Sequence, residues 1–403
     1  MRIGIVFPDL ISSKAVERYT LDLARSLAAQ HDVHVFANRW ETLPGNVQVH
    51  KVWAAPGPYF LRLLTFAINV TRKLRRYSLD LVNVQGCCAL AADVATAHSC
   101  HSAYWQRARE LPWPARLRKL LNPFHYVALY LSNRLLAERS TRWIVAVSEG
   151  VRNEIHNFHG FPMEKIMVRP PGVDLEEFHP ANRAKYRAGI RSALSFQRDD
   201  FVLLFVGREF DRKGLDLVLQ AMARIDEPRL KLLVAGSANR AIQRKYERLA
   251  RELAVEVCFA GRQADMARIY AAADIFVLPS LYEAFPMAVL EAAASGMPIL
   301  GSRTNGISDV LVDGHNGFYV RRDAGDIAAR INVLMQDQPL LDHMGAAARA
   351  SVQLFDYQTV KRTLLLTYSR MSRDASASFA AEHYVDDSSQ ALSGPPEHAA
   401  LPR

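Results

Sequence analysis

Two carboxylates with a defined spacing, Glu283 and Glu291, lie in the stretch YEAFPMAVLEAAASG (282–296). Carboxylates accept hydrogen bonds from hydroxyl groups, so the pair suits a ligand that carries many hydroxyls. Pro286 lies between them and is predicted to be the first helical residue, because its missing N–H costs nothing at that position. We therefore expect Glu283 in a loop and Glu291 on the helix that follows.

The predicted helix start also suits an anion. The first backbone N–H groups of a helix have no partner within it, and the helix dipole favours negative charge there. Met287 and Ala288 would supply these N–H groups, and Phe285 closes the loop before the proline. This set can bind sugar or ribose hydroxyls together with a phosphate. Taken alone, the pattern is explained equally well if Glu283 is a solvated loop residue and Glu291 forms a salt bridge on the surface.

A second candidate cluster lies in FVGREFDRKGLDLVLQAM (205–222), between a predicted strand and a helix that begins near Gly214. Its basic residues are Arg208, Arg212 and Lys213. A guanidinium can hold two phosphate oxygens and an ammonium acts as a point charge, so the cluster suits a pyrophosphate. The same charges would stabilise a departing phosphate. An ordinary solvated basic loop is the alternative.

A histidine, His98, follows directly on a predicted strand in DVATAHSCHSAYW (93–105). Its imidazole can hydrogen-bond a sugar hydroxyl, although a structural role is the alternative. The nearby Cys100 and His101 belong to no paired metal-binding spacing. We therefore expect no metal.

The elements that must position these residues form two series. Short apolar runs alternate with helical patterns, which is typical of parallel sheets covered on both faces. The predicted strands are RIGIVF, DVHVFA, VQVHKVW, LDLVNV, DVATA and RWIVAV, then FVLLFVG, LKLLVAG, VEVCFAG, DIFVLPS and PILGS. The fold class is therefore α/β, with two Rossmann-like doubly wound domains that face each other across a cleft. Ligands of such sheets bind at the carboxyl ends of the strands.

The domain boundary is expected in VRPPGVDLEEFHP (168–180), where two prolines and a glycine make a stiff connector. The predicted domains are residues 1–172 and 173–355. A helix over 356–372 would return towards the first domain. Residues 373–403 are rich in Ser, Ala, Pro and acids, which predicts a disordered tail.

The positive charge of the chain is concentrated in its first half. The formal net charge is +9, and residues 60–143 hold thirteen Arg and Lys against four acids. Segments 58–77 and 105–136 mix these bases with Trp, Tyr, Phe and Leu, a composition that suits helices on an anionic membrane surface. A basic helical subdomain with its apolar face in the core is the alternative. Nucleic acid is not expected, because no recognition motif accompanies the charge.

The expected location is cytoplasmic, at the inner face of the plasma (inner) membrane. Four cysteines without paired spacing suit a reducing compartment. The N-terminal apolar run is too short for a signal peptide, and no run approaches the roughly 18 residues of a membrane span.

Taken together, these motifs resemble the family-4 retaining glycosyltransferases of the GT-B fold. The Glu-x7-Glu element at 283–291 is the most specific signature, and the resemblance spans roughly residues 2–372. VGREFDRKGLD resembles the family's phosphate-binding loop, AHSC its active-site histidine, and VAVSEGVRNEI and RPPGVDLEEFHP its inter-domain region. VGREFDRKGLD and the PPG turn look most like the lipopolysaccharide-core glucosyltransferases.

The resemblance assigns roles to these residues. Arg208 and Lys213 would hold the donor pyrophosphate, Glu283 and His98 would contact the donor sugar, and Glu291 would bind the ribose. The catalytic set is then Glu283, His98, Arg208 and Lys213, and the donor-binding set is Arg208, Arg212, Lys213, Glu283, Phe285, Met287, Ala288 and Glu291. Transfer would retain the anomeric configuration and use no metal or other cofactor.

The implied function is transfer of a hexose, expected from a UDP-sugar, to a lipid-linked or cell-surface glycan in lipopolysaccharide or exopolysaccharide synthesis. A nucleotide-sugar epimerase or isomerase on the same fold is the alternative. The first loop departs from the family pattern, because Lys14 and Ala15 stand where Gly-Gly is usual. Close backbone approach to a ligand is therefore not expected there.

Overall fold

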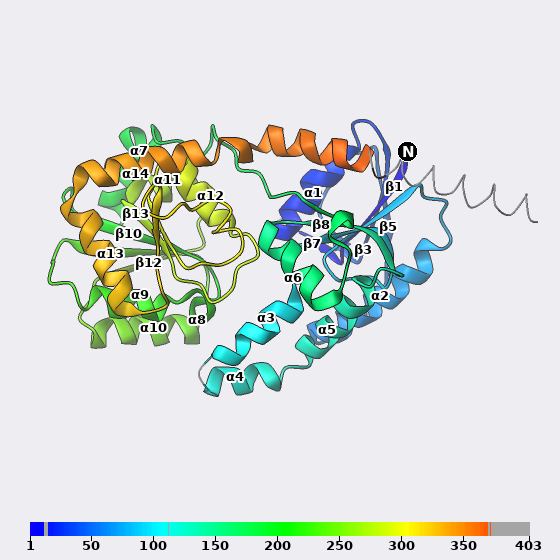
Figure 1. Ribbon diagram of the computed structural model, residues 1–403, viewed down its shortest axis with the longest axis horizontal. Coiled ribbons are helices and arrows are strands. Elements are labelled where there is room, and N and C mark those ends of the chain that lie inside the picture. Colours follow the sequence, from blue (N-terminus) through cyan, green and yellow to red (C-terminus); the bar gives the residue numbers. More distant parts are fainter. Residues whose placement is uncertain (12–14, 112, 370, 372–403) are drawn as a thin grey trace, which may run out of the picture.

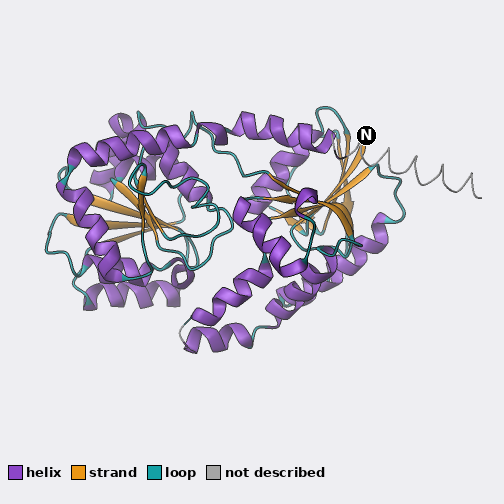
Figure 2. Cartoon of the chain, in the orientation of Figure 1, coloured by secondary structure: helices purple, strands orange, loops and turns teal. Residues whose placement is uncertain are grey.

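Parallel strand pairing organises both halves of the chain. The computed structural model describes residues 1–11, 15–111, 113–369 and 371, and two large sheets form the centres of its two domains (Figure 1). The first sheet has the order β5-β3-β1-β6-β7-β8-β9 and the second β12-β11-β10-β13-β14-β15. Helices cover the sheets (Figure 2), which confirms the predicted fold class of two Rossmann-like domains.

The strands follow the predicted apolar runs closely. Those of the first sheet are β1 (Arg2–Val6), β3 (Asp32–Ala37), β5 (Val47–Lys51), β6 (Leu81–Gln85), β7 (Ala92–Ala97), β8 (Thr141–Ala146) and β9 (Ile166–Val168). Those of the second are β10 (Phe201–Val206), β11 (Leu230–Ala235), β12 (Val257–Gly261), β13 (Ile275–Leu278), β14 (Ile299–Gly301) and β15 (Gly317–Tyr319). The short strands β9 and β15 escaped prediction, as did the small pair β2 (Asp9–Leu10) and β4 (Arg39–Trp40).

The helices of the first domain are α1 (Ala15–Leu27), α2 (Tyr59–Leu74), α3 (His101–Arg107), α4 (Trp113–Leu120), α5 (Pro123–Leu135) and α6 (Glu149–His159). Those of the second are α7 (Asn182–Ala193), α8 (Phe210–Lys213), α9 (Leu215–Met222), α10 (Arg240–Glu252), α11 (Met266–Ala272), α12 (Met287–Ala294), α13 (Ala324–Gln336) and α14 (Gln338–Ser351). Three 3-10 turns are η1 (Ala108–Glu110), η2 (Met163–Lys165) and η3 (Gln353–Phe355). Within the described residues, no helix combines the length and the apolar composition needed to cross a bilayer.

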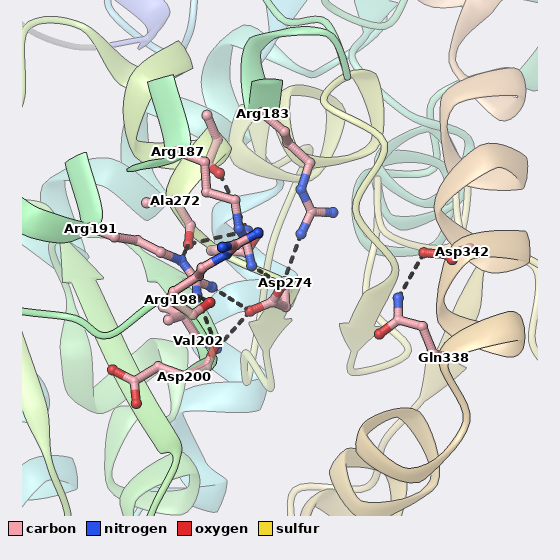
Figure 3. Close-up of polar contacts among 12 residues, drawn as sticks. Arg183, Arg187, Arg191, Arg198, Asp200, Val202, Ala272, Asp274, Gln338 and Asp342 are labelled. Atoms are coloured by element: carbon pink, nitrogen blue, oxygen red, sulfur yellow. Dashed lines mark hydrogen bonds and ion pairs between the residues drawn. The ribbon is translucent and has the colours of Figure 1, made fainter. Parts of the chain in front are cut away.

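Helix α7 is tied to the second sheet by charge. Figure 3 shows three of its arginines converging on Asp274, which directly precedes β13. Asp274 Oδ1 accepts from Arg183 at 2.8 Å and from Arg187 at 2.6 Å, and Oδ2 accepts from Arg191 at 2.7 Å. Oδ2 also accepts from the backbone N–H of Val202 at 2.8 Å. The aspartate therefore fastens α7 to strand β10 as well.

The chain returns to the first domain at its C-terminal end. A helix begins at residue 357 and runs to the first domain (Figure 1). Its side chains Leu364, Tyr368 and Met371 are buried in the core around β1. At the connector, Val173 N–H donates to the carbonyl of Phe355 at 2.8 Å. The predicted tail over 373–403 and Lys14 of the first loop lie outside the described residues.

The apolar face of helix α2 belongs to the core. Leu63, Phe66, Ala67 and Val70 are buried in the first-domain cluster, so this helix has the core alternative considered above for segment 58–77. Its first turn still exposes Tyr59 and Leu61. Larger exposures lie on and after α4, where Trp113 is 67% exposed and Leu121 72%.

Candidate functional site

Glu283 is the centre of a buried charge cluster at the carboxyl end of β13. Its Oε1 accepts hydrogen bonds from Lys213 Nζ and Ser280 Oγ, both at 2.8 Å, and lies 3.2 Å from Arg212 Nη1. Burial alone would raise the pKa of this carboxyl, but the charges of Lys213 and Arg212 and these hydrogen bonds outweigh it and lower the pKa. Glu283 is therefore charged at neutral pH. Among the described residues, its Oε2 has no hydrogen-bond partner.

Two glycines allow Lys213 to reach Glu283. A Cβ at Gly207 would lie 2.2 Å from Lys213 Cδ, so the lysine stem passes over a bare backbone. Gly214 ends α8 in the left-handed region at φ +79°, and a Cβ there would lie 2.6 Å from the carbonyl of Pro279. The basic cluster was predicted as a loop. Arg212 and Lys213 instead lie on the one-turn helix α8, packed on the Glu283 loop, and Arg208 precedes that helix.

The three predicted pyrophosphate cations differ in their surroundings. Lys213 and Arg212 are ion-paired with Glu283. Arg212 also donates to Glu209 Oε2 at 2.6 Å and to the carbonyl of Tyr282. Arg208 is exposed and makes no hydrogen bond or ion pair with the part of the chain that the structure describes. Arg208 is thus the most available of the three, whereas Arg212 holds the loop.

Glu291 lies in the second turn of α12 and is held by a tyrosine. Its Oε2 accepts from Tyr270 OH at 2.8 Å, while its Oε1 has no hydrogen-bond partner in the part of the chain that the structure describes. Burial raises the pKa of this carboxyl, and the bond from Tyr270 offsets part of that rise. Pro286 caps α12 rather than forming its first helical residue, because its backbone is extended at ψ 111°. The side chain of Pro286 makes no capping hydrogen bond to the helix start at Met287 and Ala288.

A cavity of about 440 Å³ brings part of the predicted site together. It lies between α1, the connector and the C-terminal helix, and its lining includes Phe285, Met287, Glu291 and His98. Arg208, Arg212, Lys213, Glu283 and Ala288 do not line it. The predicted set is therefore divided. Phe285, Met287, Glu291 and His98 line the cavity, Arg212, Lys213 and Glu283 form an ion-paired cluster in the second domain, and Arg208 and Ala288 belong to neither group.

His98 supplies the first domain's contribution to the cavity. Burial lowers its pKa to about 4, so the imidazole is neutral at physiological pH. Its Nε2 lies 2.9 Å from Oε1 of Gln85, and the ring of Tyr19 meets it edge-on with centroids 5.1 Å apart. A neutral imidazole in this position can exchange a hydrogen bond with a ligand hydroxyl.

Four residues that support this site were not predicted from the sequence: Ser280, Tyr270, Tyr19 and Gln85. Ser280 lies three positions before Glu283, and a hydroxyl so close to a loop carboxylate was an available signal. Tyr270 and Gln85 are on other elements, and no spacing links them to Glu291 or His98. Among the described residues, no group of three or more His, Cys, Asp or Glu side chains could hold a metal ion.

Comparison with known proteins gives matches on both domains. Residues 187–351 match the family model "Glycosyl transferases group 1", and residues 16–177 match "Glycosyltransferase Family 4". A D-inositol 3-phosphate glycosyltransferase of Mycobacterium bovis is 30% identical over 323 residues, which is 70% of this chain and 65% of that protein. One from Geodermatophilus obscurus is 31% identical over 256 residues, 58% of this chain and 54% of its own length. The matched region thus spans about half of that relative.

Solved structures agree on the fold. WaaG, described as a glycosyltransferase involved in lipopolysaccharide biosynthesis, has a TM-score of 0.75 at 22% identity and covers 90% of this chain and 98% of its own. Anabaena Alr3699/HepE, solved with UDP and glucose, has a TM-score of 0.70 at 21% identity over 92% and 100% of the two chains. The two family models confirm the expected family resemblance, and the solved structures confirm the expected fold. The chain belongs to the family-4 glycosyltransferases and has the GT-B fold.

Proposed function

We propose that this protein is a retaining glycosyltransferase that moves a hexose from a nucleoside diphosphate sugar, with UDP as the expected nucleotide, to a glycan or glycolipid. The observation that supports this most is the pair of spare carboxylate oxygens. Glu283 Oε2 and Glu291 Oε1 have no partner in the described residues, while the other oxygen of each side chain is held in place. Each glutamate is thus pre-positioned to accept a hydrogen bond from a ligand hydroxyl.

The donor would span the cavity and the ion-paired cluster. Glu291 would bind the ribose, the helix start at Met287 would face the phosphates, and Glu283 and His98 would contact the sugar. Arg208 and Lys213 would neutralise the pyrophosphate. The UDP and glucose held by the Anabaena protein support a ligand of this class.

The chemistry would need no metal, because two cations are available where the leaving phosphate develops charge. The bond from the anomeric carbon to the β-phosphate oxygen breaks as the acceptor hydroxyl bonds to the same carbon on the same face. The acceptor's proton passes to the departing phosphate. Lys213 would shift from its ion pair with Glu283 to share its protons with that phosphate.

Thermal unfolding with UDP-, GDP- and ADP-sugars tests the donor. A ligand at 100 times its Kd stabilises the native state by about 2.7 kcal/mol, so one nucleotide should stand out. UDP release that depends on an acceptor would support transfer. Conversion of the donor into another sugar nucleotide without acceptor would instead show the epimerase alternative.

The acceptor proposal rests on the surface around α4. Trp113, Leu117 and Leu121 are exposed beside Arg116 and Arg118, so apolar and cationic groups share α4 and the residue that follows it. Such a mixture suits an anionic membrane surface, where each base contributes about 1 kcal/mol. We therefore propose a lipid-linked acceptor and a peripheral location on the inner face of the plasma membrane.

Flotation with liposomes tests the membrane proposal. Binding should require anionic lipid, fall with salt, and weaken when Trp113 and Leu121 are both changed to Ser. Binding to neutral vesicles only, or none at low salt, would reject it. Because the curated relatives are named for D-inositol 3-phosphate, a phosphorylated inositol should be assayed as a soluble acceptor beside glycolipids.

A further inference from the structure

A buried chain of amide side chains runs from the C-terminal helix to His98. We propose that Gln85 is a positioning residue that fixes His98 as the Nε2–H tautomer, so that Nδ1 accepts a hydrogen bond from a donor-sugar hydroxyl. The inference rests on the proposed function and adds the direction of this hydrogen bond to it.

The chain begins at Tyr368, which reaches the first sheet from the C-terminal helix. Asn83 Nδ2 donates to the hydroxyl of Tyr368, and it also lies 3.2 Å from Thr96 Oγ1. The Oδ1 of Asn83 then faces Gln85 and also accepts from Thr96 Oγ1 at 3.4 Å. Asn83, Thr96 and Tyr368 are all fully buried, so no water competes for these groups.

The orientation of Asn83 determines that of Gln85. Gln85 Nε2 donates to Asn83 Oδ1, and also to Thr96 Oγ1 at 3.0 Å. Two acceptors therefore hold the NH2 group of Gln85, and its Oε1 is left to face His98 Nε2 at 2.9 Å. Reversal of this amide alone would place two oxygens, Gln85 Oε1 and Asn83 Oδ1, against each other. In a fully buried position that arrangement is costly.

The orientation of the Gln85 amide determines which ring nitrogen of His98 carries the proton. A carbonyl oxygen can only accept, so His98 Nε2 must carry the proton. Nδ1 is then the lone-pair nitrogen, and it has no hydrogen-bond partner in the described part of the chain. The edge-on ring of Tyr19 packs against the imidazole, and His98 lines the cavity that also holds Glu291. A hydroxyl that enters the cavity would donate to Nδ1.

Nitrogen-15 NMR of histidine-labelled protein tests the tautomer directly, and the His98→Asn variant identifies the signals of His98. We expect a protonated Nε2 and an unprotonated Nδ1 in the wild type. In Gln85→Leu, the ring should average between both tautomers. The kcat/KM for the hexose donor should fall about tenfold, the weight of one hydrogen bond, while affinity for UDP, which lacks the sugar, should change less than about twofold.

Gln48→Leu is the matched control, because Gln48 is an exposed glutamine on β5 that donates to Asp32 Oδ1 and lies outside the chain of amides. It should leave tautomer and kinetics unchanged. A wild-type His98 protonated on Nδ1 would overturn the inference, as would an equal loss of UDP affinity in Gln85→Leu, which indicates general damage. If wild-type protein fails to bind any nucleoside diphosphate sugar, the proposed function fails, and the tautomer measurement still decides the polarity of the chain.

Discussion

Two buried carboxylates of the second domain, Asp274 and Glu283, are each surrounded by basic side chains, and the way they are satisfied differs. Both oxygens of Asp274 are occupied, by three arginines of α7 and a backbone N–H (Figure 3). Glu283 has its three contacts, with Lys213, Ser280 and Arg212, on Oε1 alone. The protein therefore occupies both oxygens of Asp274, whereas Oε2 of Glu283 is left to bind a ligand.

The difference separates a structural clamp from a binding site. A saturated buried ion cluster has no capacity left for a ligand, so its effect is on stability. A carboxylate held firmly by one oxygen has both the orientation and the capacity that recognition needs. Charge and burial alone do not distinguish the two carboxylates. The number of carboxylate oxygens that already have a protein partner does distinguish them. Variants that alter one carboxylate at a time test this distinction.

The largest expected effect is on stability, in Asp274→Asn. The change leaves Arg183, Arg187 and Arg191 without their counter-charge, and breaking a buried ion pair costs about 3–5 kcal/mol. The free energy of unfolding, measured with urea, should fall by that amount. Donor affinity of the folded fraction should remain. Unchanged stability would show that Asp274 is no clamp.

For Glu283→Gln the main loss should be in catalysis. The amide keeps the shape of the side chain but removes its negative charge. That charge orders Lys213 and strengthens the hydrogen bonds that the carboxylate accepts from sugar hydroxyls. The kcat should fall about 100- to 1,000-fold, the range seen for one pre-organised electrostatic contact. Unfolding should be affected less than in Asp274→Asn, because Arg212 keeps Glu209. Wild-type turnover would remove Glu283 from the site.

Lys213→Ala should act on donor affinity. Charge-assisted hydrogen bonds contribute about 1.5–3 kcal/mol, so the Kd for UDP should rise about 10- to 100-fold by calorimetry. Lys245→Ala is the control, since Lys245 pairs with Asp211 on the surface at 2.7 Å and should leave the Kd unchanged. If both variants raised the Kd equally, Lys213 would act only through the overall positive charge of the protein and not through a direct contact with UDP.

The sequence allowed prediction of most of the fold, because buried parallel strands are continuous apolar runs that read directly from the chain. It also singled out Glu283, Glu291 and His98, whose residue types and places after strands indicate their chemistry. The partners of these residues escaped prediction. Gln85 meets His98 and Tyr270 meets Glu291 only because neighbouring elements pack together, and no local pattern encodes such contacts.

The basic loop shows the same limit in another form. The charges of Arg212 and Lys213 were evident, but not that Glu283 would neutralise them. That pairing depends on α8 packing against the loop after β13. Likewise, the mixed composition of segment 58–77 does not tell a core-facing helix from a surface one, and only the burial of Phe66 and Val70 decides it.

A third carboxylate, Glu154 on α6, shows what happens when the described residues form no ion pair with the group and Arg107 acts on it only weakly. Its Oε2 accepts from the hydroxyl of Tyr282 at 2.9 Å, and that hydroxyl is also 3.1 Å from the backbone nitrogen of Cys100. Tyr282 belongs to the second domain and Glu154 to the first, so the contact crosses between them. Burial raises the pKa of Glu154 to about 7, although hydrogen bonds from Asn305 and Tyr282 oppose the rise.

The smallest effect should therefore be a pH dependence. The pKa of Glu154 is raised from 4.5 in the unfolded chain to about 7, so its contribution to stability is complete below pH 4.5 and is lost as the pH rises through 7. In Glu154→Gln this loss is absent. The variant should gain about 1–2 kcal/mol over the wild type between pH 5 and pH 8, a value discounted for the solvent that reaches this half-buried group. Urea unfolding at both pH values measures the difference. A constant difference between the proteins across this range would mean that Glu154 is ionised throughout, as Glu283 is, and that a phenol can replace a cation in holding a buried carboxylate charged.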